Sequence, residues 1–167
     1  MASAAVTETR TTARILIVGF GNSLRGDDGL GPYVVQQLAL RGPESICIRV
    51  LLQLTPELAQ DVARAELAIF VDADMSPAEG VSIRAAKESA VPAGLTHVAG
   101  VEALLGLAKL AYGKAPVAWI VSVAGYDFSF REGLSSLAQE NARQATAKIE
   151  ELIRESGASR RLPKVDA

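Results

Sequence analysis

The chain has 167 residues, a length that suits one domain with a sizeable core and is short for two. Hydrophobic residues make up 49% of it, but no apolar run approaches the length of a membrane span, so we expect no membrane partner. Lysine and arginine (17) nearly balance aspartate and glutamate (19), and no basic cluster occurs in the body of the chain, which argues against a nucleic-acid partner.

The two ends differ in composition from the rest. Residues 1–13 are small and polar and contain no hydrophobic signal-peptide segment, so we expect a disordered N-terminal tail on a cytoplasmic protein. Residues 157–167 are expected to form a flexible C-terminal tail. Residues 14–156 are then the folded domain, which we expect to be a monomer. A single cysteine, Cys47, excludes an internal disulfide framework.

Within this domain, short apolar runs alternate with helical patterns. Continuous aliphatic runs, with no polar alternation, are typical of strands that are covered on both faces. We predict strands at 15–18, 46–52, 67–71, 81–85 and 117–123, and helices at 32–41, 55–64 and 98–112, with a last helix beginning near Ser135 or Ser136. This order predicts a single α/β domain, with a twisted, mostly parallel sheet of about five strands and helices on both faces.

Several local signals set the helix limits. Thr55 is expected to cap the second helix, and Gln139 is placed for a capping box at the start of the last one. The last helix is expected to bury a stripe of its apolar residues: Leu134, Leu137, Ala138, Ala145, Ile149 and Leu152. The strand at 81–85 is shorter and more polar than the others, which favours a position near the sheet edge.

Polar residues follow two of the predicted strands. Asn22, Asp27 and Asp28 come after the first strand, and Asp72 and Asp74 end the third. We expect the first and third strands to be adjacent, and in an open α/β sheet the carboxyl ends of the strands form the ligand-binding edge. These carboxylates are therefore predicted to meet.

His97 is the only histidine, and it precedes the predicted helix at 98–112. Projected onto that helix it falls in line with the apolar side, so its imidazole should point inward. Two carboxylates and one imidazole form an O,O,N donor set with open positions, which suits an exchangeable divalent metal better than a closed structural zinc site.

Each of these residues also has a purely structural interpretation. The Asp27–Asp28 pair suits a turn or a helix cap, Asp72 suits a loop cap, and a lone inward histidine suits a hydrogen-bonded core position. A dinucleotide fingerprint is disfavoured, because the glycine spacing after the first strand is wrong and the carboxylates there would repel a pyrophosphate.

Four segments together resemble the nickel–iron hydrogenase maturation endopeptidases. They are GFGNSLRGDDGLG at 19–31, QLTPELA at 53–59, VDAD at 71–74 and THVAGVEALLGLA at 96–108. The resemblance covers nearly the whole chain from Ile15 to about Ile153, and the first segment is the most specific.

The resemblance implies one α/β domain that removes a short C-terminal extension from the large subunit of a nickel–iron hydrogenase after nickel insertion. It implies that Asp28, Asp72 and His97 are the metal-binding and catalytic residues, with the nickel contributed by the precursor. Some members of the family carry glutamate where this chain has Asp28.

Two other functions remain compatible with the same residues. One is a metal-independent aspartic-type protease in which Asp28 and Asp72 share a proton. The other is a non-catalytic metal-sensing chaperone of hydrogenase assembly, which would inspect the precursor without cutting it.

Overall fold

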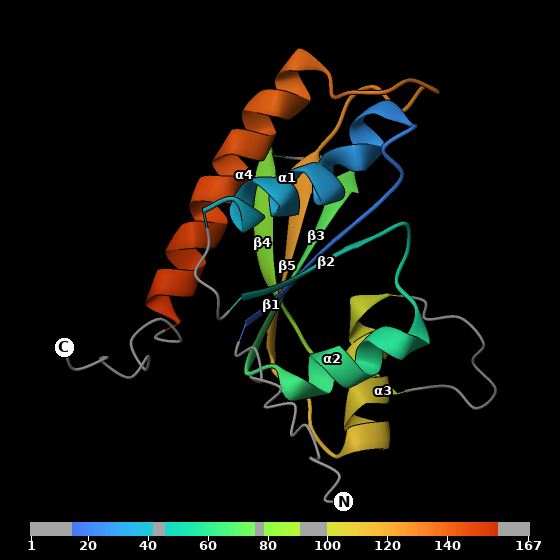
Figure 1. Cartoon of the computed structure of the whole chain (residues 1–167), viewed down its shortest axis with the longest axis vertical. Coiled ribbons are helices and arrows are strands. Elements are labelled where there is room, and N and C mark those ends of the chain that lie inside the picture. The colour runs from blue at the N-terminus through green and yellow to red at the C-terminus, as the bar shows by residue number, and fades with distance from the viewer. Residues whose placement is uncertain (1–14, 42–45, 76–78, 91–99, 157–167) are drawn as a thin grey trace, which may run out of the picture.

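A computed structural model describes residues 15–41, 46–75, 79–90 and 100–156. The predicted tails, 1–13 and 157–167, lie outside the described residues, as does His97. The described residues form a single α/β domain built on one five-stranded sheet (Figure 1). No helix in these ranges is both long enough and apolar enough to cross a bilayer.

The sheet is mixed and mostly parallel, as predicted. Its strands are β1 (Ile15–Phe20), β2 (Ile46–Leu51), β3 (Leu67–Asp74), β4 (Val81–Ala86) and β5 (Val117–Ala124). Their order is β2-β1-β3-β5-β4, and every neighbouring pair is parallel except β4 with β5. The predicted adjacency of the first and third strands is thus confirmed, and so is the edge position of the fourth.

The direction of β4 follows from its connection to β3. β3 ends at Asp74 and β4 begins at Val81, and this interval is too short for the crossover that a parallel strand requires. β4 therefore turns back, and alternation of buried and exposed residues along it fits an edge strand.

Two pairs of helices cover the two faces of the sheet (Figure 1). α1 (Leu30–Ala39) and α4 (Ser136–Glu155) pack on one face, and α2 (Ala59–Arg64) and α3 (Val101–Tyr112) on the other. The 3-10 turns Gly26–Gly29 and Pro56–Leu58 precede α1 and α2. At β1 and β3 both faces of the sheet are thus covered by helices, which explains why these strands are continuous apolar runs.

Some local predictions are wrong in instructive ways. Thr55 precedes the second helix but its side chain makes no cap hydrogen bond. Leu137 is 64% exposed, because α4 turns Asn141, Ala142 and Thr146 toward the sheet along with Ala138. The first strand continues through Gly19 to Phe20, and the third continues past Val71 to Asp74.

Candidate active site

The chain turns sharply at the carboxyl end of β1. Gly21 has φ 139°, a conformation that other residues rarely adopt, and its N–H donates to the carbonyl of Leu51 at 3.0 Å. A Cβ atom at Gly21 would lie 2.0 Å from the carbonyl oxygen of Asp28. Glycine at this position therefore lets residue 28 approach the end of the strand.

A second close approach places α1 directly on the sheet. A Cβ atom at Gly19 would lie 2.3 Å from the carbonyl oxygen of Gly31, and one at Gly31 would lie 2.4 Å from that of Val71. These glycines bring the first turn of α1 against β1 and β3. The preceding Gly26–Gly29 turn is thereby held at the carboxyl edge of the sheet.

Asp28 and Asp72 line the same cavity, of about 310 Å³, at this edge. One carboxylate oxygen of Asp28 accepts a hydrogen bond from the backbone N–H of Asn22 at 2.9 Å. Asp72, in the last part of β3, accepts one from the N–H of Ala73 at 2.8 Å. The convergence of the two carboxylates, expected from the strand order, is thus present in the structure.

The cavity wall explains the electrostatics of Asp72. Apolar residues and the backbone line most of the cavity: Phe20, Gly21, Leu52, Leu54 and Gly100. Burial raises the pKa of Asp72 to about 6, the Ala73 N–H opposes this rise, and the negative charges of Asp28 and Asp74 add to it. A carboxyl group with this pKa can exchange a proton near neutral pH.

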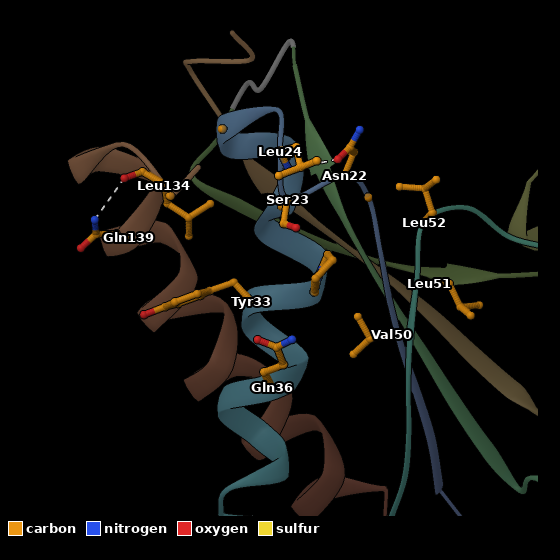
Figure 2. Close-up of a pocket in the computed structure, with 15 residues that line it drawn as sticks. Asn22, Ser23, Leu24, Tyr33, Gln36, Val50, Leu51, Leu52, Leu134 and Gln139 are labelled. Atoms are coloured by element: carbon orange, nitrogen blue, oxygen red, sulfur yellow. Dashed lines mark hydrogen bonds between the residues drawn. The ribbon is translucent and has the colours of Figure 1, made fainter. Parts of the chain in front are cut away.

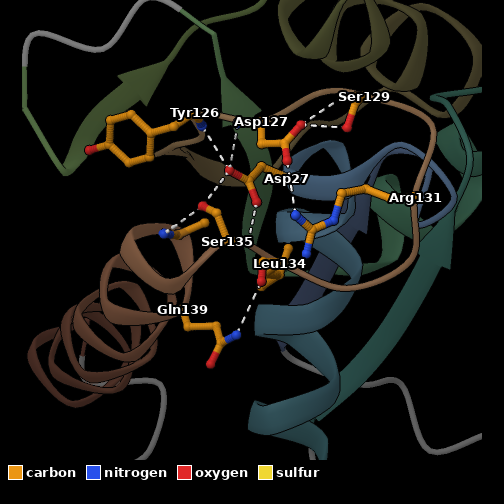
Figure 3. A network of polar contacts seen from close by, with 9 residues as sticks. Asp27, Tyr126, Asp127, Ser129, Arg131, Leu134, Ser135 and Gln139 are labelled. Atoms are coloured by element: carbon orange, nitrogen blue, oxygen red, sulfur yellow. Dashed lines mark hydrogen bonds and ion pairs between the residues drawn. The ribbon is translucent and has the colours of Figure 1, made fainter.

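Asp27 does not line this cavity, and its side chain points toward the segment that follows β5 (Figure 3). It is completely buried, and its carboxylate accepts four hydrogen bonds from the segment that follows β5. The donors are the backbone N–H groups of Tyr126 (2.8 Å), Asp127 (3.0 Å) and Ser135 (2.7 Å) and the hydroxyl of Ser135 (2.7 Å). Asp27 therefore fastens the turn after β1 to the start of α4.

Hydrogen bonding outweighs desolvation at Asp27. Burial alone would raise the pKa of its carboxyl, but the N–H groups of Tyr126, Ser135 and Asp127 and the Ser135 hydroxyl together hold this pKa below its usual value. Of the two adjacent aspartates, Asp27 is a structural anchor and Asp28 faces the cavity.

The predicted capping box at the start of α4 is not formed. Ser135 is the N-cap of α4, and its hydroxyl accepts from the N–H of Ala138 at 3.2 Å. With Ser135 as the N-cap, Gln139 lies one residue beyond the capping-box position, and it donates instead to the carbonyl of Leu134, while the N–H of Ser135 donates to Asp27. The sequence pointed to Ser135 as a cap but gave no sign of its partner 108 residues away.

Asn22 has a supporting position. Its side-chain oxygen accepts from the N–H of Leu24 at 3.0 Å and forms an Asx turn, while its own N–H binds Asp28. The amide expected at the sheet edge therefore shapes the loop that orients the carboxylate.

The assignment of His97 stays a prediction, because this residue lies outside the described ranges. Gly100, three residues later, lines the cavity with Asp28 and Asp72, and α3 begins at Val101 with its apolar side on the sheet. No group of three histidine, cysteine or acidic side chains suited to a metal is found within residues 15–41, 46–75, 79–90 and 100–156. The two carboxylates are oxygen donors that a divalent ion accepts, and they leave coordination positions open.

Fold and site together define a class: a single-domain α/β protein with paired carboxylates in a cavity at the carboxyl edge of its sheet. No protein-family model matches the sequence, and neither does any curated protein sequence. Solved structures do match. The hydrogenase maturating endopeptidase HybD from E. coli is 28% identical over 86% of this chain and 94% of its own, with a TM-score of 0.67.

Two further structures agree with this match. An endopeptidase from Escherichia coli is 25% identical over 86% of this chain and 94% of its own, with a TM-score of 0.63. The [NiFe] hydrogenase maturation protease HycI from Thermococcus kodakarensis KOD1 shares the fold, with 23% identity, coverage of 85% and 93%, and a TM-score of 0.64. The chain therefore shares its fold with hydrogenase maturation endopeptidases of known structure, and its sequence resembles that of HybD over most of its length, a likeness consistent with a peptide-bond hydrolase.

Proposed function

We propose that this protein removes the C-terminal extension from the nickel-loaded large-subunit precursor of a nickel–iron hydrogenase, acting in the cytoplasm as a monomer. The observation that supports this proposal most is the convergence of Asp28 and Asp72 on one cavity at the carboxyl edge of the sheet. The reaction class of the proposal comes from the similarity to hydrogenase maturation endopeptidases.

In this proposal the nickel is part of the substrate. Asp28, Asp72 and His97 contact the nickel of the docked precursor and fill positions that its own ligands leave open. None of the three is a thiolate, so they bind the nickel more weakly than the softer ligands of the precursor do. The metal therefore stays on the precursor while the site contacts it. A precursor without nickel lacks this contact and docks weakly.

Asp72 is also suited to a part in peptide hydrolysis. Its raised pKa lets it accept a proton from the water that attacks the scissile carbonyl and pass that proton to the leaving amine nitrogen as the C–N bond breaks, near neutral pH. Polarisation of the scissile carbonyl by the substrate nickel is a second contribution compatible with the same cavity.

The competing mechanism is a metal-independent pair of carboxylates that share one proton. The negative charge of Asp28 contributes to the raised pKa of Asp72, as expected for neighbouring acids. The two mechanisms differ in what the substrate must contain, because the proton-sharing pair has no need of nickel.

The experiment is incubation of the purified protein with nickel-loaded precursor, followed by intact-mass measurement. A mass loss equal to the C-terminal extension is the expected result. An unchanged mass with a stable complex would instead indicate a chaperone. Cleavage that survives removal of nickel from the precursor and is fastest in acid would indicate the proton-sharing pair. Glu140→Gln is a control variant, since Glu140 is an exposed partner of Arg143 on α4 and does not line the cavity.

A further inference from the structure

A second, larger cavity opens beside the carboxylates. It is an open groove of about 670 Å³, which we call the α1 groove. Tyr33 and Gln36 on the exposed side of α1 form its floor (Figure 2). The end of β2 lies on one side of it, and Leu134 and Gln139 at the start of α4 lie on the other.

The α1 groove is continuous with the cavity of Asp28 and Asp72. Gly21 and Leu52 line both, so a chain that lies in the groove can continue past these two residues to the carboxylates. An occupant of the groove is therefore positioned relative to the reacting bond.

The chemistry of the groove differs from that of the cavity. None of the described residues that line it is charged. Its apolar side chains are unusually exposed for their type: Tyr33 38%, Val50 44%, Leu24 46% and Leu52 67%. A charged side chain bound here would lose water without gaining a partner, so the groove favours uncharged, apolar residues.

An extended peptide matches these features. β2 has a single partner strand, β1, in the described part of the chain, and its last residues, Val50 and Leu51, line the groove. An open strand edge offers main-chain hydrogen bonds to an extended peptide, while apolar contacts select its side chains. The amide group of Gln36 can bind peptide carbonyl and N–H groups in addition.

From this arrangement we infer that the α1 groove binds the C-terminal segment of the precursor next to the scissile bond, as an extended, uncharged and largely apolar stretch. The inference rests on the proposed function, since it assigns a specificity subsite to the same reaction. Tyr33 is the contact we single out, because it lines the groove and its ring extends from α1 toward α4 (Figure 2).

The test compares two tyrosines of similar exposure. Tyr33→Ala removes a ring from the groove, and Tyr112→Ala removes one that is 49% exposed at the end of α3, outside the groove. For nickel-loaded precursor we expect Tyr33→Ala to raise KM about tenfold with kcat within about twofold of wild type, the pattern of lost ground-state binding. Tyr112→Ala should match the wild type in both constants.

A second readout does not depend on turnover. A photo-crosslinking amino acid at Gln36, which is exposed, should capture the C-terminal segment of the precursor, whereas the same group at Leu110 on α3 should not. If the wild type cleaves the precursor and Tyr33→Ala has the same KM as Tyr112→Ala, the inference is overturned and the proposed function stays intact. Crosslinks from Gln36 that map outside the C-terminal segment would have the same meaning. No cleavage by the wild type would refute the proposed function itself, and the Gln36 crosslink would still decide whether the segment binds in the groove.

Discussion

Replacing Asp27 by asparagine tests whether the buried aspartate is a structural anchor. The change keeps the shape of the side chain and removes its charge. One carboxylate oxygen accepts from Tyr126, Asp127 and the Ser135 hydroxyl, and the other accepts only from the Ser135 N–H, at 2.7 Å. The asparagine oxygen should therefore take the first position, which places its NH₂ group against the Ser135 N–H.

The loss of stability in Asp27→Asn follows from this mismatch. One charge-assisted hydrogen bond is lost, worth about 1.5–3 kcal/mol, and a buried donor is left without an acceptor, worth about 1–3 kcal/mol. Because these two contributions overlap, we expect a loss of about 3 kcal/mol in the free energy of unfolding. For a domain of this size each kcal/mol lowers Tm by about 2–4 °C, so Tm should fall by about 10 °C.

The assay is urea unfolding at pH 7 together with a thermal melt, with Glu140→Gln as the control. Glu140 is an exposed partner of Arg143 on α4, and solvent screening means that its loss should leave the stability nearly unchanged. Cleavage per folded molecule should change little in Asp27→Asn, since Asp27 does not face the cavity. An unchanged Tm would refute the anchoring role, and loss of cleavage at full stability would mean that Asp27 is the catalytic member of the pair.

The same anchor has a defined pH dependence. The pKa of Asp27 is lower in the folded protein than in the unfolded chain, so its contribution to stability is present above the unfolded pKa, about 3.9. It is lost as the pH falls through the folded pKa. The stability difference between wild type and Asp27→Asn should therefore shrink below about pH 4.

Three further predictions concern the cavity. Asp28→Asn, Asp72→Asn and His97→Ala should each abolish or greatly weaken cleavage with the circular dichroism spectrum unchanged; full activity in any one would remove that residue from the site. Asp72→Asn should also stabilise the fold above about pH 6, by up to roughly 2 kcal/mol, because the raised pKa means that the ionised Asp72 destabilises the native state. This gain in stability should vanish below about pH 4. A lower stability of Asp72→Asn than of the wild type at pH 7.5 would contradict the prediction. The isolated protein should be purified largely free of metal and bind nickel, zinc or cadmium only when the ion is in excess, measured by calorimetry; tight stoichiometric nickel in the purified protein would contradict this.

The sequence predicted the architecture well because buried parallel strands leave an unmistakable pattern. The unbroken apolar runs of β1 and β3 identify strands covered on both faces, and their adjacency brings Asp28 and Asp72 together. The edge position of β4 followed from its polarity. These features depend on local composition and on general rules of sheet topology.

Contacts between segments that are far apart in the sequence could not be predicted. Nothing near Asp27 indicates that its partners are residues 126, 127 and 135. The sequence also left open whether Ser135 or Ser136 begins the last helix, and the choice of Ser135 places Gln139 outside capping-box register. The exposure of Leu137 has a similar origin, since the rotation of α4 is set by packing against α1 and the sheet. The α1 groove likewise exists only where β2, α1 and α4 meet.

The most direct test of the account compares nickel-free and nickel-loaded precursor under identical conditions, scored by loss of the C-terminal peptide. Because Asp28, Asp72 and His97 are proposed to contact the substrate nickel, the loaded form should be cleaved and the nickel-free form left intact. Asp28→Asn should bind loaded precursor no better than the wild type binds nickel-free precursor. Equal cleavage of both forms by the wild type would show that these residues do not sense the metal.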